Sequence, residues 1–178
     1  SHQYPLGTLM SASRRLELLD WAEQNRTWII EDDYDSEYRY ASRPLGSLQG
    51  MDNSSRVIYI GTFSKVLFPS IRIGYLVVPN ELVKQFVQIR ESLDIFSPIL
   101  YQLALNDFIE QGHFARHLRK MRSIYLERQK ALLVSLQKHF GNSVTAYNTD
   151  GGLHLCVFLS QKIADQQIAH NAAKRGIS

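Results

Sequence analysis

The chain has 178 residues, of which 44% are hydrophobic and 21% are charged, with a formal net charge of +3 at pH 7. This balance excludes a disordered chain, and the small positive charge gives little support for a nucleic-acid-binding surface. No apolar run is long enough to cross a membrane. The single cysteine, Cys156, permits no internal disulfide, which agrees with a reducing cytoplasm, and we interpret it as a small buried hydrophobic residue rather than a reactive thiol.

The first half of the sequence combines helical and strand-like patterns. After a turn that contains proline and glycine, Ser11 or Ser13 can cap a helix that ends near Asn25. The residues expected on its buried face are Ala12, Leu16, Leu19 and Ala22. Three strand-like runs follow, at residues 27–30, 57–61 and 71–78.

These three runs lack strict polar alternation, and the first of them follows an amphipathic helix. They therefore predict the buried strands of an α/β sheet. Only a short segment separates the second run from the third, which leaves no room for a crossover helix. We expect the third strand to be antiparallel to the second, within a mixed sheet.

The second half of the sequence is mainly helical. Helices are expected at residues 79–93, 97–112, 114–140 and 163–174, and two strands joined by a turn at residues 150–152 are expected between the last two helices. The chain begins in a turn segment without an initiator methionine, and it ends in RGIS, where another strand is expected. We predict that it is an interior part of a longer protein.

Lys65 interrupts an almost wholly apolar run, VIYIGTFSKVLFPSIRIGYLVV. Two hydroxyls, Thr62 and Ser64, and the guanidinium of Arg72 lie close to it in sequence, and together they suit a phosphate dianion. A lysine in apolar surroundings, where its pKa is lowered, can form an imine with an aldehyde. An aldehyde that carries a phosphate indicates pyridoxal 5′-phosphate. The alternative is a surface lysine whose amine stays in water.

The acidic segment EDDYDSE follows the first expected strand and offers a partner for the ring of this cofactor. The ring nitrogen needs a carboxylate to keep its proton, and ligands of open α/β sheets gather at the carboxyl ends of strands. Asp32, Asp33 and Tyr34 are expected there, with Tyr34 donating to the phenolic oxygen. The alternatives are a solvated acidic loop and a calcium site, but Tyr38 occupies the position where a calcium loop needs glycine, so we expect no metal.

Other polar groups receive structural interpretations. We favour a charged helix face, which can pack against a partner subunit, over a DNA-binding patch for the basic run Arg116, His117, Arg119, Lys120 and Arg122. Four histidines have no metal-ligand spacing and are interpreted as structural: His113, His139, His154 and His170. Tyr38 and Tyr40 are interpreted as packing residues.

The combination of EDDYDSEYRY with GTFSKVLFP, within a run from Ser1 to Pro79, closely resembles the MocR/GabR subfamily of GntR-type bacterial transcription regulators. These proteins join an N-terminal winged helix-turn-helix to a large domain with the fold-type I, aspartate aminotransferase-like architecture. The resemblance is looser after Pro79, but the order of helices and strands fits. It implies an α/β fragment of that fold, with part of the large mixed-sheet subdomain and part of the small α+β subdomain.

The resemblance also implies residue roles. Lys65 forms an internal aldimine with pyridoxal 5′-phosphate, Asp32 pairs with the pyridine nitrogen, and Tyr34 hydrogen-bonds to the phenolic oxygen. Thr62 and Arg72 hold the phosphate, with Ser64 as a further contact. Aminotransferases also carry an asparagine near the ring, and the residues available here in its place are His2 and Gln3.

By the same resemblance, residues 1–95 form the back half of the cofactor-binding large subdomain, and residues 96–178 form connecting helices and the start of the small subdomain. The winged helix-turn-helix, the glycine-containing phosphate loop and a carboxylate-binding arginine are expected outside this chain. The implied function is a cytoplasmic, homodimeric sensor of an amino-compound effector, or of the cofactor itself, and this piece alone is expected to bind the cofactor weakly or not at all. The alternatives are a genuine aminotransferase that acts on an amino acid and a binding scaffold without cofactor.

Overall fold

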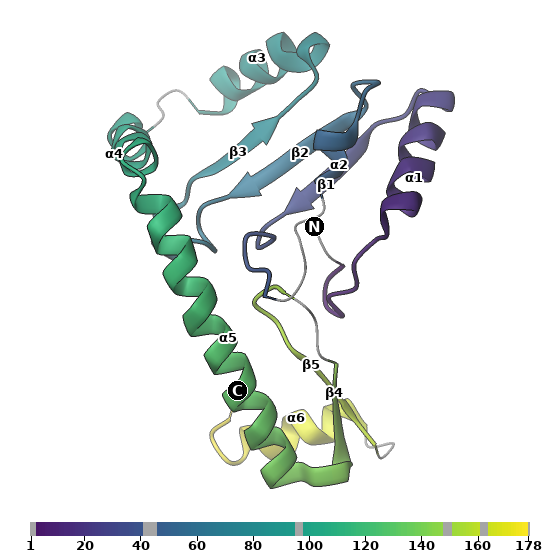
Figure 1. Cartoon of the computed structure of the whole chain (residues 1–178), viewed down its shortest axis with the longest axis vertical. Coiled ribbons are helices and arrows are strands. Elements are labelled where there is room, and N and C mark those ends of the chain that lie inside the picture. Colours follow the sequence, from purple (N-terminus) through teal and green to yellow (C-terminus); the bar gives the residue numbers. More distant parts are fainter. Residues whose placement is uncertain (1–2, 41–45, 95–97, 148–150, 161–163, 178) are drawn as a thin grey trace.

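The computed structural model describes residues 3–40, 46–94, 98–147, 151–160 and 164–177. Within these ranges, a three-stranded sheet and a two-stranded sheet lie at opposite ends of a long helix (Figure 1). The strands are β1 (Ile29–Asp33), β2 (Val57–Thr62), β3 (Gly74–Val77), β4 (Val144–Tyr147) and β5 (Cys156–Leu159). Of the turn expected at residues 150–152, residue 150 lies outside the described residues, and the second strand of this pair begins only at Cys156.

The larger sheet has the order β1-β2-β3, with β1 parallel to β2 and β3 antiparallel to β2. The expected mixed sheet is therefore confirmed. The third strand is shorter than expected, because Pro69–Ile71 forms a 3-10 turn and Arg72 has a left-handed backbone, with φ of 49°, before β3 begins.

The helices agree with the expected ranges to within a few residues, apart from the one-turn helix α2, which lies in a segment expected to be mainly loop. They are α1 (Ala12–Gln24), α2 (Leu48–Met51), α3 (Val83–Leu93), α4 (Ile99–Glu110), α5 (His113–Phe140) and α6 (Asp165–Ala173). In Figure 1, α1 flanks the larger sheet on the β1 side, and α5 runs from α4 down to the β4–β5 pair. None of the helices in the described part of the chain combines the length and apolar character that a membrane span requires.

The buried face of α1 differs from the expected one at three positions, because Ala12 and Leu16 are exposed and Arg15 is buried. Ser11 caps the helix by accepting a hydrogen bond from the backbone N–H of Arg14 at 3.3 Å, and Leu19 is buried. Leu16, however, is 51% exposed, whereas Arg15 is 2% exposed. The Arg15 guanidinium donates to two backbone oxygens, of Met10 at 3.2 Å and of Gly46 at 2.7 Å, and these bonds compensate for its loss of hydration.

A small core joins α1, α2 and one face of the sheet. Leu19, Leu48 and Val57 form its buried centre, and partly buried apolar side chains of α1, β1 and α2 pack around them. At its polar border, the carboxylate of Glu31 accepts hydrogen bonds from the N–H groups of Leu48 and Gln49, each at 3.0 Å. This contact attaches the start of α2 to β1.

The opposite face of the sheet is open among the described residues. Along β1, Glu31 and Asp33 are buried, while Ile30, at 66% exposure, and Asp32 point away from the core. Leu76 of β3, at 49% exposure, also belongs to this open face, because its Cα partner on β2 is Ile60, which also pairs with Asp32.

The turn before β2 is organised by one carboxylate. The Asp52 oxygens accept from the N–H and hydroxyl of Ser54 at 2.9 and 3.0 Å, and from the N–H groups of Arg56 and Val57 at 2.6 and 2.8 Å. Desolvation by burial acts to raise the pKa of Asp52, but these hydrogen bonds outweigh it, so the pKa of this carboxyl lies below its usual value.

We predict that Asp52→Asn lowers the free energy of unfolding by about 1–3 kcal/mol near neutral pH, because the amide offers one acceptor oxygen instead of two. A lowered folded-state pKa contributes stability above the unfolded-state pKa, and this contribution is lost as the pH falls through the folded-state value. The difference between wild type and variant should therefore shrink in acid. Chemical denaturation across a pH series measures it, and a difference that is constant with pH contradicts the prediction.

Gly61 provides a second test of the packing. A side chain at this buried position would overlap the Tyr75 ring, which contacts Phe63 at 5.4 Å between ring centroids and Tyr59 at 6.0 Å. We predict that Gly61→Ala costs about 1–3 kcal/mol of unfolding free energy by overpacking. In a Tyr75→Ala background the same substitution should cost much less, and equal costs in the two backgrounds would contradict this account.

Candidate functional site

Lys65 lies in the turn that follows β2. The N–H of Leu67 donates to the Phe63 oxygen at 2.9 Å and closes this turn, and Val66 is buried at 1% exposure. The Lys65 side chain itself is exposed. The apolar surroundings expected from the sequence therefore belong to the neighbours of Lys65, and its amine reaches solvent in the described structure.

Asp32 and Thr62 lie on the same open face of the sheet. In the parallel pairing of β1 with β2, the Cα partner of Asp32 is Ile60. Side chains alternate along a strand, so Thr62, two residues after Ile60, faces the same side as Asp32. Both residues lie at the carboxyl ends of their strands, where open α/β sheets bind ligands. Lys65 follows Thr62 by three residues, so its turn leaves the sheet at this edge.

The expected phosphate-binding residues share one loop region. The Thr62 hydroxyl accepts from the N–H of Ser64 at 3.1 Å and donates to the Ile73 oxygen at 3.4 Å. The N–H of Phe63 donates to the same oxygen at 2.9 Å, which holds the residue after Arg72 against the end of β2. Thr62 and Ser64 are half-buried and the Arg72 side chain is exposed.

Tyr34 lies one residue beyond β1 and is half-buried. Its ring contacts the ring of His154 at 5.9 Å between centroids, and His154 also contacts Tyr4 at 5.4 Å. Burial, followed by the negative charge of Asp35, raises the pKa of the Tyr34 phenol, so it remains a hydrogen-bond donor at neutral pH. The sequence carries no periodic signal that places His154 beside Tyr34, because the two are 120 residues apart.

The acidic segment after β1 is not a solvated loop. Asp33 and Asp35 are 7% and 1% exposed. Asp33 accepts from the Ser36 N–H at 3.2 Å, the Ser36 hydroxyl at 2.6 Å and the Tyr59 hydroxyl at 2.9 Å, and Asp35 accepts from the Leu153 N–H at 2.9 Å. These carboxylates therefore stabilise the loop. In the described ranges, no group of three His, Cys, Asp or Glu residues is placed to hold a metal ion.

The end of this acidic segment pairs with the chain that leads into β5. The N–H of Gly152 donates to the Tyr38 oxygen at 2.7 Å, and the Tyr40 hydroxyl donates to the Gly152 oxygen at 3.1 Å. A Cβ at Gly151 would lie 2.5 Å from the Tyr38 oxygen, so glycine is required for this close approach. Burial, with the charge of Asp35, raises the pKa of Tyr40 to about 12.

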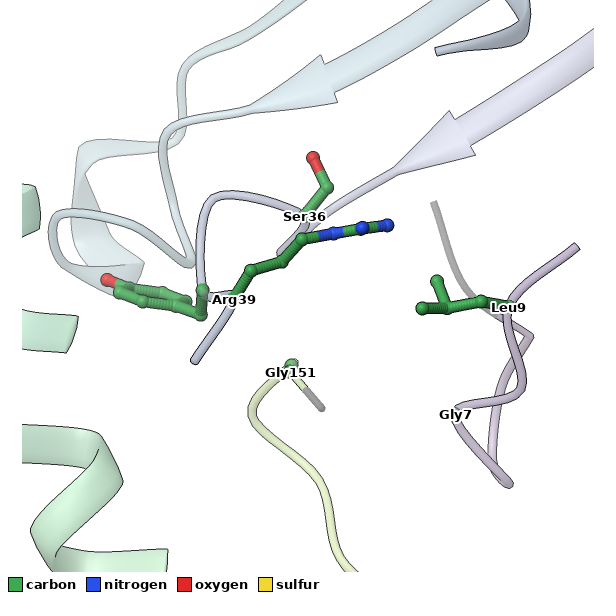
Figure 2. A pocket seen from close by; sticks show the side chains of 7 residues that line it. Gly7, Leu9, Ser36, Arg39 and Gly151 are labelled. Carbon is green, nitrogen blue, oxygen red and sulfur yellow. The ribbon is translucent and has the colours of Figure 1, made fainter. Parts of the chain in front are cut away.

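Figure 2 shows a small pocket where three segments distant in sequence meet. Leu9 points into it from the N-terminal turn, and the Arg39 side chain extends across it from the segment after β1. Gly151 closes the third side. The pocket thus marks the junction between the N-terminal turn, the acidic segment and the approach to β5, and none of the expected cofactor-binding residues lines it.

The N-terminal turn bears on two further expectations. His2 lies outside the described residues, and the exposed Gln3 side chain hydrogen-bonds within its own turn, to the Tyr4 oxygen and from the Leu6 N–H. Gln3 is therefore not oriented by the sheet as a ring contact. Cys156 is half-buried and its thiol donates to the Pro5 oxygen at 2.7 Å, which agrees with a structural role for this residue.

Comparison with known proteins places these features in a family. The sequence matches the family Aminotransferase class I and II over residues 1–177. It is 43% identical over 178 residues to the probable rhizopine catabolism regulatory protein MocR of Rhizobium meliloti, covering 100% of this chain and 36% of that protein. It is 41% identical over 178 residues to the uncharacterized HTH-type transcriptional regulator YhdI of Bacillus subtilis, covering 100% of this chain and 38% of that protein.

A solved structure gives the same result for the fold. The kynurenine aminotransferase of Pyrococcus horikoshii, in complex with PMP, has a TM-score of 0.89 and 30% sequence identity, covering 99% of this chain and 44% of that chain. The expected fold-type I architecture is therefore confirmed, as is the resemblance to MocR-type regulators. The chain spans less than half the length of each of these proteins. Because the family match covers nearly all of its residues, the chain belongs to the aminotransferase class I and II family.

Proposed function

We propose that this chain is part of the cofactor-binding, effector-sensing domain of a MocR-type transcription regulator, with pyridoxal 5′-phosphate as its cofactor. The observation that carries the proposal is the shared face of Asp32 and Thr62 beside the Lys65 turn. This arrangement offers a carboxylate, a hydroxyl and an amine on one edge of the sheet. The higher identity to the regulators, 43% against 30% to the aminotransferase, favours sensing over transamination.

Each residue has a distinct role in this proposal. Pyridoxal phosphate supplies an aldehyde that condenses with amines and a ring that withdraws electrons when its nitrogen is protonated. Lys65 provides the amine, and Asp32 keeps the proton on the ring nitrogen. The raised pKa of Tyr34 keeps its hydroxyl available to donate to the phenolic oxygen. Thr62 and Ser64 provide hydroxyls for the phosphate, and Arg72 provides a guanidinium. To donate to the phosphate, the Thr62 hydroxyl must give up its hydrogen bond to the Ile73 oxygen.

The sensing role requires a second amine. An amino-compound effector would compete with Lys65 for the same aldehyde, and its binding would free the lysine amine. We assign residues 1–95 to the large subdomain and residues 96–178 to the connecting helices and the start of the small subdomain. In the whole protein, a homodimer in the bacterial cytoplasm would transmit the change to an N-terminal DNA-binding domain.

A working aminotransferase is the second candidate, and the close structural likeness to the kynurenine aminotransferase supports it. In that case Lys65 would also move a proton between the substrate carbon and the cofactor, as a general acid and base. The whole protein distinguishes the two: effector-dependent DNA binding without turnover supports the regulator, and sustained conversion of an amino acid to its oxo acid supports the enzyme.

The role of Lys65 can be tested by trapping. When the full-length protein is incubated with pyridoxal phosphate and reduced with borohydride, we expect a stable adduct that peptide mass spectrometry locates at Lys65. Lys65→Ala should abolish the adduct, whereas Lys84→Ala, which removes an exposed lysine of α3, should leave it unchanged. An adduct of undiminished yield in Lys65→Ala contradicts the proposal.

The role of Asp32 can be tested by its charge. Asp32→Asn removes the anion that would hold the ring proton, and we expect the affinity for pyridoxal phosphate to fall by about 10- to 100-fold, the range for loss of a hydrogen bond to a charged group. Asp20→Asn, at an exposed position of α1, is the matched control. Spectrophotometric titration measures both, and equal affinities for the two variants exclude Asp32 from the ring contact.

A further inference from the structure

The backbone oxygen of Val66, the residue next to Lys65, accepts hydrogen bonds from two side chains. Tyr38 donates its hydroxyl at 3.2 Å, and Nε2 of His117 lies at 2.9 Å. Tyr38 comes from the segment after β1 and His117 from the first turns of α5. Val66 and Tyr38 are each 1% exposed, so water does not compete effectively for this oxygen.

Both contacts are chemically consistent. A carbonyl oxygen has two lone pairs and can accept both bonds. Nε2 must carry a proton to donate to a carbonyl, and it does so in one neutral tautomer and in the imidazolium, so the His117 contact does not depend on ionisation. Burial, with the nearby Tyr125, raises the pKa of the Tyr38 phenol, which keeps its proton at any physiological pH.

These bonds complete the fixation of the lysine turn. Before Lys65, the N–H of Ser64 is held by the Thr62 hydroxyl at 3.1 Å. Across Lys65, the N–H of Leu67 is held by the Phe63 oxygen at 2.9 Å. After Lys65, the Val66 oxygen is held by Tyr38 and His117, two side chains from outside the turn. The backbone on both sides of Lys65 is thus fixed while its side chain stays exposed.

The same helix contacts the acidic segment. Nε of Arg122 donates to the Glu37 oxygen at 2.6 Å, and the Tyr125 ring meets the Tyr38 ring edge to face, at 5.0 Å and 90°. The interpretation of the basic run as a charged helix face is therefore wrong for His117 and Arg122, which donate to backbone oxygens of the two loops that border the candidate site. The sequence contained one sign that this part of the helix packs against other residues: Leu118 and Ile124 continue the hydrophobic spacing through the basic run.

We propose that His117 and Tyr38 are positioning residues for Lys65. By holding the Val66 oxygen they fix the backbone that carries the lysine, and so set the direction from which its amine approaches the cofactor aldehyde. Neither side chain touches the cofactor in this proposal. It rests on the proposed function of Lys65, and it extends the site to α5, which belongs to the second half of the chain.

The test separates covalent attachment from binding of the ring and phosphate. His117→Gln keeps an N–H donor near the position of Nε2, whereas His117→Leu has a similar size and no donor. In the full-length protein, we expect His117→Leu to slow the formation of the borohydride-trapped adduct at Lys65 by about tenfold, as for loss of one hydrogen bond, and His117→Gln to restore it to within about threefold. Affinity for pyridoxine phosphate, which lacks the aldehyde, should stay within about twofold of wild type in both variants.

Tyr38→Phe provides an independent variant, because it removes only the hydroxyl and keeps the ring against Tyr125. It should slow attachment in the same way without weakening pyridoxine phosphate binding. Attachment at the wild-type rate in His117→Leu and Tyr38→Phe overturns the positioning role while the function of Lys65 stands. A parallel loss of attachment and of pyridoxine phosphate binding shows a general structural role and also overturns it. Absence of any adduct in the wild-type protein overturns the proposed function itself.

Discussion

The parallel pairing of β1 with β2 is the constraint on which the candidate site depends. Its register sets Asp32 opposite Ile60, so that Asp32 and Thr62 share one face and Glu31 and Asp33 share the other. A slip of one residue would exchange the two faces and bury Asp32 among apolar side chains. The two carboxylates on the covered face stabilise this register, because Glu31 binds the start of α2 and Asp33 binds Ser36 and Tyr59.

The acidic side chains of the run EDDYDSE therefore have two functions, which depend on the face of β1 on which they lie. Residues that face the core, or lie in the loop beyond β1, satisfy backbone and hydroxyl donors. Asp32, on the other face, stays exposed and available. This division explains how so many negative charges are tolerated in a short segment: the buried ones are hydrogen-bonded, and hydrogen bonding repays the loss of hydration.

The sequence predicted the element order, the mixed sheet and the antiparallel β3, because these depend on local periodicity and on the length of connections. It was wrong where a distant backbone oxygen decides burial. Arg15 is buried in place of Leu16 because Gly46, 31 residues away, accepts from its guanidinium. The sequence analysis also missed the contacts of His117 with Val66 and of Tyr34 with His154, because these partners are far apart in the chain and no short-range pattern encodes them. The exposure of Lys65 differed from expectation because apolar neighbours in sequence need not surround the amine.

Because α5 is long, its contact with Val66 connects distant parts of the molecule. The helix has 28 residues and is therefore about 42 Å long, and His117 lies near its start while the β4–β5 pair lies against its end. From His117 to the last residue of the helix is about 34 Å, and the contacts of Arg122 and Tyr125 hold the first part of this length to the acidic segment. A single rigid helix therefore connects the lysine turn and the acidic segment to the β4–β5 pair at the opposite end of the molecule.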